Sequence, residues 1–255
     1  MLYRHTFKRK RQNRHVVDAF HGFFGSGSDF QELQEHCNFD LRAWDLLGFG
    51  NSLIPDEGSL YSLDHQLDLI DFEDRPHLLG YSMGGRLALQ WAVQNPDRIQ
   101  SLVLIGAHPG IKEGEAKKAR REWDMEWSRY FATNSIEACW QAWSELPLIK
   151  DQCSTSNIQQ RLQTRLSQDP RSLSWSMRYF GSGCMTDCWK ELSALKVPVL
   201  LIAGERDLKY IELNRQMAIY LPQVEILIQS GAGHAPHFEQ PESVGRALSR
   251  WYQRF

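Results

Sequence analysis

The stretch Gly80-Tyr81-Ser82-Met83-Gly84-Gly85 decides the fold, because it places the pattern G-x-S-x-G between a predicted strand and a predicted helix. Residues 76–79 read as a short buried strand, and residues 86–94, rich in Leu and Ala, read as a helix. In that context the pattern predicts a sharp turn that exposes a nucleophilic serine. Gly80 and Gly84 are expected there because a Cβ at either position would clash in so tight a turn. Outside such a context, the same pattern also arises by chance in Gly-rich loops.

A serine nucleophile needs a base and an acid, which in folds with this turn follow it in the order acid, then histidine. Asp207 comes just after the strand-like run 197–202, and His234 comes after a second run, 224–228. We therefore predict Ser82, Asp207 and His234 as the catalytic residues. A neutral imidazole would take the serine proton, and the carboxylate would hold the imidazole tautomer and stabilise the imidazolium.

Two neighbouring side chains compete for these roles. Glu205 precedes Asp207 by two residues, and His237 follows His234 by three. His234 is favoured as the base because small residues precede it and give its loop the freedom to approach Ser82. His237 is then a pocket residue, and Glu205 a solvated loop acid.

The loop Phe20-His21-Gly22-Phe23-Phe24-Gly25 follows the strand-like residues 16–19. A loop in this position supplies one backbone N–H of an oxyanion hole, and the residue after the nucleophile supplies the other. We predict these donors to be Phe23 and Met83, which would stabilise negative charge that develops on a substrate oxygen. A glycine turn that merely closes the strand is compatible with the same residues.

Strand-like and helix-like runs alternate along most of the chain. This pattern predicts an α/β fold, with a mostly parallel twisted sheet flanked by helices. The predicted strands are 16–20, 39–44, 77–81, 101–106, 197–203 and 224–228, and the predicted helices are 62–73, 83–94, 209–221 and 241–254. No strand signal appears between 106 and 197. We therefore predict a core made of residues 1–110 and 191–255, with a helical lid, residues 111–190, inserted between two core strands.

The predicted lid is rich in tryptophan and arginine. Six of the nine tryptophans lie in it, where most would pack against the core and some would cover a pocket. Arg86 falls one helical turn after Ser82, and the lid adds further arginines, among them Arg120, Arg121 and Arg165. Arginine binds carboxylates through paired hydrogen bonds, so these residues favour an anionic substrate, to which Tyr81 would offer a hydroxyl. The alternative for each lid arginine is a solvated helix face.

Composition excludes several classes of protein. The 255 residues carry a net charge of −2, with 42% hydrophobic and 24% charged residues, which indicates one globular domain without affinity for nucleic acid or acidic membranes. The basic run 8–14 is interpreted as a solvated loop or strand edge. No run reaches the ~18 apolar residues of a membrane span, and no apolar segment follows Met1, so we expect a cytoplasmic protein.

The five cysteines support that expectation. Their odd number and the lack of C-x-x-C spacing argue against a disulfide framework and against a zinc site, and they favour a reducing compartment. Cys184 and Cys188 lie four residues apart, a helical spacing that predicts buried thiols.

Residues 80–89, Gly-Tyr-Ser-Met-Gly-Gly-Arg-Leu-Ala-Leu, resemble one family of α/β hydrolases, the 2-succinyl-6-hydroxy-2,4-cyclohexadiene-1-carboxylate synthases of menaquinone and phylloquinone biosynthesis. The resemblance covers nearly the whole chain and includes His21-Gly22-Phe23 and the run at 106–110. It continues through Ala119–Asp124 in the lid and through the residues around Asp207 and His234. The chain departs from the family at Asp45–Gly50, where the usual Asp-x-Pro-Gly-His-Gly lacks its Pro and His.

The resemblance implies a lyase rather than a hydrolase. Such an enzyme eliminates pyruvate from 2-succinyl-5-enolpyruvyl-6-hydroxy-3-cyclohexene-1-carboxylate, with the triad serine as the base. By resemblance, five residues bind this polycarboxylate: Tyr81, Arg86, Arg120, Trp143 and Arg165. No metal or organic cofactor is implied, and we expect a monomer whose only partner is the small-molecule substrate.

Two other classes of function use the same residues. A serine carboxylesterase or C–C bond hydrolase would form an acyl-enzyme on Ser82 and show burst kinetics with an activated ester. A ligand receptor built on a hydrolase scaffold would bind tightly without turnover, and its affinity would be indifferent to His234→Ala.

Overall fold

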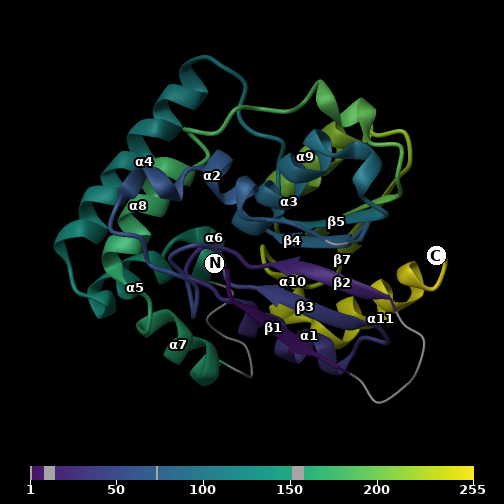
Figure 1. Ribbon diagram of the computed structural model, residues 1–255, viewed down its shortest axis with the longest axis horizontal. Helices are drawn as coiled ribbons and strands as arrows, with labels where there is room; N and C mark the ends of the chain where they lie inside the picture. The colour runs from purple at the N-terminus through teal and green to yellow at the C-terminus, as the bar shows by residue number, and fades with distance from the viewer. Residues whose placement is uncertain (1, 9–14, 73, 151–157) are drawn as a thin grey trace.

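A single sheet of seven strands forms the centre of the computed structural model, which describes residues 2–8, 15–72, 74–150 and 158–255 (Figure 1). The strand order is β1-β3-β2-β4-β5-β6-β7, and every neighbouring pair is parallel except β1 with β3. The strands are β1 (Arg4–Phe7), β2 (Val16–Phe20), β3 (Asp40–Trp44), β4 (His77–Tyr81), β5 (Ser101–Ile105), β6 (Val199–Gly204) and β7 (Val224–Gln229). The predicted mostly parallel sheet is therefore confirmed.

Helices cover both faces of this sheet, as Figure 1 shows. Side chains of α2, α3 and α9 belong to the larger apolar core on one face, and those of α1, α10 and α11 to the core on the other. These helices are α1 (Gln31–Glu35), α2 (Leu63–Asp68), α3 (Met83–Gln94), α9 (Leu208–Ala218), α10 (Pro236–Glu239) and α11 (Pro241–Tyr252). Short 3₁₀ helices among the described residues are Gly27–Phe30, Gly58–Tyr61, Pro96–Arg98 and Glu191–Ala194.

The central strand β4 shows why these residues form a doubly covered sheet. Successive side chains of a strand point to opposite faces. Leu78 accordingly packs into the first core and Leu79 into the second, and both are fully buried. A strand buried on both faces reads as a continuous apolar run, which is the signal seen in the sequence. The carboxyl end of β4 carries the G-x-S-x-G turn.

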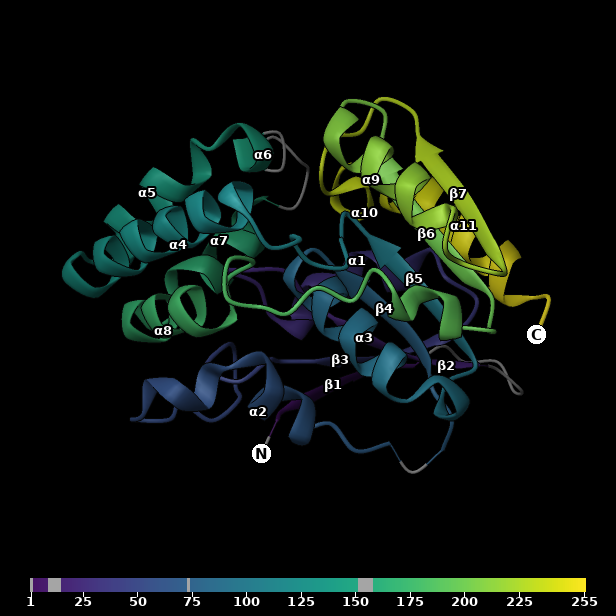
Figure 2. The same cartoon turned by 90° about the horizontal axis from the view of Figure 1, so that it is seen from above.

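In the described part of the connection from β5 to β6, five α-helices gather beside the sheet (Figure 2). They are α4 (Glu115–Thr133), α5 (Ile136–Ser144), α6 (Pro147–Lys150), α7 (Ile158–Leu166) and α8 (Pro170–Phe180). Helix α4 makes its main packing contacts with α8. None of the described helices combines the length and the apolar character that crossing a bilayer requires.

The structure differs from the sequence predictions most clearly at one strand, one helix end and one cysteine. Strand β1 was not predicted; it is four residues long, lies at the sheet edge and alternates between exposed and half-buried side chains. Helix α2 ends at Asp68 rather than at 73. The prediction for Cys184 is wrong: it lies in a turn rather than a helix and is exposed, whereas Cys188 is buried. Of the basic run, residues 9–14 lie outside the described residues.

Candidate active site

Ser82 occupies a strained turn between β4 and α3. Its backbone has φ 50° and ψ −108°, a region that residues other than glycine rarely adopt. A Cβ added to Gly80 would lie 2.4 Å from Gly85 Cα, and one added to Gly84 would lie 2.3 Å from the Phe20 carbonyl oxygen. The predicted need for glycine at both positions thus follows from close backbone approach. The strain is held where a nucleophile must project from the sheet.

Ser82, His234 and Asp207 come together from three separate loops at the carboxyl ends of strands. His234 Nδ1 lies 2.7 Å from Asp207 Oδ2, and His234 Nε2 lies 3.3 Å from Ser82 Oγ. The side chains of His234 and Asp207 are almost completely buried. When Nδ1–H donates to Asp207, Nε2 is left to accept a proton from the serine hydroxyl. The structure thus brings together the three residues that the sequence predicts as a triad.

Phe23 and Met83, the predicted oxyanion-hole residues, lie at the same cavity as Ser82. Both residues line the cavity, and within the described part of the chain neither N–H has a hydrogen-bond acceptor. Met83 is the first residue of α3, where a backbone N–H has no intrahelical partner. Phe24, next to Phe23, has φ 64°, so the loop after β2 is strained as well. Two unpaired donors beside a nucleophile can bind a developing oxyanion.

Glu205 and His237, the alternatives for the acid and the base, form no hydrogen bond with Ser82 among the described residues. The Glu205 carboxylate accepts hydrogen bonds from Ser230 Oγ and from the Gly231 N–H, and it is exposed. His237 is buried against Tyr81, with ring centroids 4.4 Å apart, and neither of its nitrogens has a partner among the described residues. Burial, with the guanidinium of Arg161 nearby, holds the pKa of His237 well below its ordinary value.

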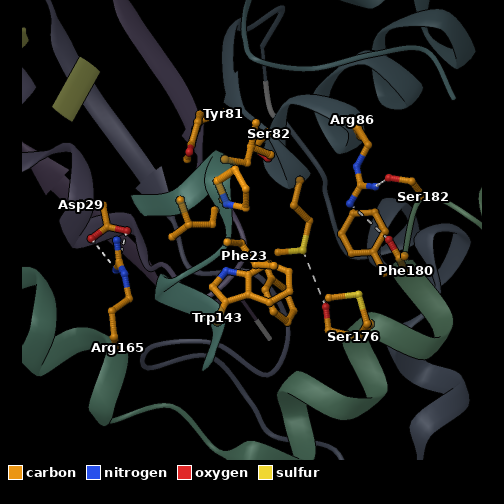
Figure 3. Close-up of a pocket in the computed structure, with 18 of the residues that line it drawn as sticks. Phe23, Asp29, Tyr81, Ser82, Arg86, Trp143, Arg165, Ser176, Phe180 and Ser182 are labelled. Carbon is orange, nitrogen blue, oxygen red and sulfur yellow. Dashed lines mark hydrogen bonds and ion pairs between the residues drawn. The ribbon is translucent and has the colours of Figure 1, made fainter. Parts of the chain in front are cut away.

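A cavity of about 400 Å³ opens above Ser82 and is lined by residues of α4, α5, α6, α7 and α8. Figure 3 shows Arg86 and Arg165 on opposite sides of Ser82 within it. Arg86 is buried and donates to Ser182 Oγ and to the Phe180 carbonyl oxygen. No carboxylate forms an ion pair with Arg86 in the part of the chain that the structure describes. Burial, with the charge of Arg120 nearby, lowers the pKa of Arg86 to about 10.

The two lid arginines of the predicted site already have acidic partners. Arg165 donates from one nitrogen to both oxygens of Asp29, at 2.8 and 2.9 Å, and both side chains are buried. Arg120 Nε lies 2.7 Å from Asp124 Oδ1, and the Arg120 guanidinium lies over the Trp123 ring. Arg120 is partly exposed and lines the cavity, so its remaining N–H groups can reach a ligand.

Aromatic side chains form the apolar wall of the cavity. Trp143 lies 4.9 Å from Phe23 between ring centroids and packs against the rings of three α4 side chains, Trp123, Trp127 and Phe131. Tyr81 lines the cavity next to Ser82 and packs on His234 and His237. Of the six lid tryptophans, Trp123, Trp140 and Trp143 face the cavity, as expected for some of them.

Several cavity residues were missed from the sequence. Lys209 and Tyr210 follow Asp207 in the first turn of α9, a position that places them beside the triad. Arg161 pairs with Glu32 at 3.2 Å. His108 Nδ1 accepts from the Gly110 N–H at 3.0 Å, and burial beside Arg86 holds its pKa well below its ordinary value. The position of Lys209, two residues after the predicted acid, was the one signal available.

The site offers no arrangement for a metal among the residues described, because no group of three or more His, Cys, Asp or Glu side chains could hold an ion. What it holds is a serine, a histidine and an acid below a cavity with cationic groups and an apolar wall. The family model for the alpha/beta hydrolase fold matches residues 19–241. The fold and this match define an enzyme of the α/β hydrolase superfamily.

Individual relatives narrow the class. A Bacillus subtilis (strain 168) protein assigned as a 2-succinyl-6-hydroxy-2,4-cyclohexadiene-1-carboxylate synthase is 33% identical over 92% of this chain and 89% of its own length. The synthase of that name from Escherichia coli O1:K1 / APEC is 27% identical over 90% of both chains. The solved structure of MenH from S. aureus has a TM-score of 0.90 and 28% identity over 98% of both chains. The chain belongs to the 2-succinyl-6-hydroxy-2,4-cyclohexadiene-1-carboxylate synthase family.

Proposed function

We propose that this enzyme eliminates pyruvate from 2-succinyl-5-enolpyruvyl-6-hydroxy-3-cyclohexene-1-carboxylate, giving 2-succinyl-6-hydroxy-2,4-cyclohexadiene-1-carboxylate. Membership of the synthase family supports this reaction and a role in menaquinone or phylloquinone biosynthesis. The observation that carries the proposal is Arg86: a buried cation without a carboxylate partner among the described residues lies in the same cavity as Ser82.

The chemistry follows from the structures of substrate and product. The hydrogen on C2 is acidic because it lies next to the succinyl keto group and next to the C3–C4 double bond. Removing it forms a double bond between C2 and C3, moves the old double bond to C4–C5, and breaks the C5–oxygen bond. The departing enolpyruvate takes up a proton and becomes pyruvate. The step needs a base and a donor for the enolate oxygen, but no oxidant.

Each candidate residue has a role in that step. Ser82 acts as the base after its hydroxyl proton passes to His234, and Asp207 stabilises the resulting imidazolium. The N–H groups of Phe23 and Met83 stabilise the charge that develops on the succinyl keto oxygen. The substrate carries three carboxylates, and Arg86, Arg120 and Arg165 are the arginines that bind them, with Tyr81 and Trp143 beside the ring. The helices at 111–190 act as the lid that excludes water.

The experiment measures pyruvate release from the substrate, made in situ by the preceding enzyme and followed with lactate dehydrogenase and NADH. Ser82→Ala should lower the rate by several orders of magnitude, in the range of ~10⁴–10⁶-fold typical of triad deletions. Ser193→Ala, at an exposed serine, should leave it unchanged. Near-normal release by Ser82→Ala would remove serine as the base. No release, with hydrolysis of an aryl ester instead, would favour the esterase.

A further inference from the structure

The loop that carries His234 is held by a carboxylate outside the triad. Glu239 Oε2 accepts from the Gly233 N–H at 2.8 Å, and Oε1 accepts from the Ala235 N–H at 3.3 Å. One buried carboxylate therefore binds the backbone on both sides of the histidine. The preceding residues Gly231-Ala232-Gly233 are small, so the loop has little side-chain packing of its own to fix it.

The same carboxylate reaches the segment that carries Asp207. Arg206 Nη2 lies 2.8 Å from Glu239 Oε2, and Arg206 Nη1 donates to the Gly231 carbonyl oxygen. The Arg206 backbone N–H donates to the Ala232 carbonyl oxygen at 2.9 Å. Arg206 directly precedes Asp207, so the Arg206–Glu239 pair joins the loop after β6 to the loop after β7.

We propose that Glu239, through Arg206, is a positioning residue that fixes His234 between Ser82 and Asp207. The imidazole must satisfy two distances at once, 3.3 Å to the serine and 2.7 Å to the acid. Its place depends on the backbone at residues 233–235, which Glu239 holds. Charged hydrogen bonds to backbone N–H groups are shorter and stronger than neutral ones, so a carboxylate suits this role. Glu239 touches no reacting atom in this scheme.

The geometry distinguishes this role from general support of the loop. Glu205 holds the same loop at its other end, through Ser230 and Gly231, but does not touch the residues next to His234. Glu205→Ala is therefore a matched control that removes an acidic side chain from the same loop. The inference rests on the proposed triad, so the test needs a readout that does not depend on the proposed elimination.

That readout is the rate at which a fluorophosphonate probe labels Ser82, since labelling requires the serine to be activated by His234. Glu239→Ala should slow labelling and lower kcat for pyruvate release by about tenfold to a hundredfold, because a misplacement of about 1 Å can cost that much in rate. KM should change little, since Glu239 lies outside the cavity lining. Glu239→Gln keeps one acceptor oxygen and should recover part of the labelling rate.

Three outcomes overturn the inference: Glu239→Ala labels at the normal rate, Glu205→Ala slows labelling as much as Glu239→Ala, or the loss falls on KM instead of kcat. Should Glu239→Ala fail to fold, Arg206→Ala and Glu239→Gln carry the test: Arg206→Ala should label slowly, and Glu239→Gln should label more slowly than wild type but faster than Arg206→Ala. If no variant and no wild-type enzyme releases pyruvate, the proposed function fails, while slowed labelling in Glu239→Ala still supports the positioning role.

Discussion

Replacing Arg86 by Met should leave the stability of the free enzyme nearly unchanged while weakening its activity. Burial lowers the pKa of Arg86 from 12.5 to about 10. At about 1.36 kcal/mol for each pKa unit, burying this charge costs about 3 kcal/mol in the absence of substrate. Methionine keeps the apolar stem and removes the charge. It also removes two hydrogen bonds donated by a charged group, to Ser182 and to Phe180. At about 1.5 kcal/mol each, these offset the burial cost, so the free energy of unfolding should change by less than about 1 kcal/mol.

Arg165→Met is the matched comparison, because Arg165 is equally buried but paired. Removing it leaves the Asp29 carboxylate buried beside the Ser26 N–H without its cation. Breaking a buried ion pair in this way costs about 3–5 kcal/mol. The two substitutions remove the same chemical group from the same cavity, yet only Arg165→Met should lower the free energy of unfolding strongly.

Urea unfolding followed by circular dichroism at pH 7.5 measures both changes, and pyruvate release measures the cost to function. Arg86→Met should lower kcat/KM by roughly tenfold to 150-fold, corresponding to the loss of one charged hydrogen bond worth about 1.5–3 kcal/mol. If Arg86→Met is destabilised as strongly as Arg165→Met, Arg86 is not an unpaired buried charge and the reasoning fails. Unchanged kcat/KM in Arg86→Met would remove it from the substrate site.

Three further predictions concern acid stability, the turn and the cavity. Burial lowers the pKa of His77 to about 4. The contribution of the neutral ring to the free energy of unfolding is therefore fully present above pH 6.5, and up to about 3 kcal/mol is lost as the pH falls toward 4. The His77→Gln variant should therefore show a shallower loss of unfolding free energy between pH 7 and pH 4.5, and an equal slope would contradict the assignment. Gly84→Ala should abolish pyruvate release and lower the unfolding free energy by about 1–3 kcal/mol, because its Cβ meets the Phe20 carbonyl; a fully active variant would show that the turn can relax. Arg120→Ala should raise KM with an unchanged circular dichroism spectrum, and an unchanged KM would place Arg120 outside the substrate site.

The parts of the fold that could be predicted from the sequence are those whose signal is local. Strand β4 is buried on both faces, so it appears in the sequence as an apolar run. The glycine turn that follows the run supports its prediction as a strand. Strand β1 gives no such signal, because it is four residues long and is defined by its antiparallel pairing with β3, some forty residues away: Arg4 pairs with Trp44. The end of α2 was also missed, since tertiary packing rather than helix propensity decides where a short helix stops.

The same distinction applies to the candidate site. Ser82, Asp207 and His234 could be predicted because each follows a strand, and parallel strands bring their carboxyl ends to one edge of the sheet. The partners of the arginines could not, because Arg165 and Asp29 are 136 residues apart and nothing near either residue identifies the other. Glu239 was missed for the same reason, since its contact with Arg206 spans 33 residues.

Arginines counted along the sequence therefore overstate the positive charge available to a substrate. Arg165 and Arg161 are matched by Asp29 and Glu32, so that side of the cavity is close to neutral before any ligand arrives. On the other side of the cavity, Arg86 and Lys209 have no acidic ion-pair partner among the described residues. Arg120 forms an ion pair with Asp124. A polycarboxylate should therefore meet its strongest attraction beside α3 and the start of α9. Binding there relieves the desolvated charge of Arg86, whereas binding at Arg165 competes with an ion pair that already exists.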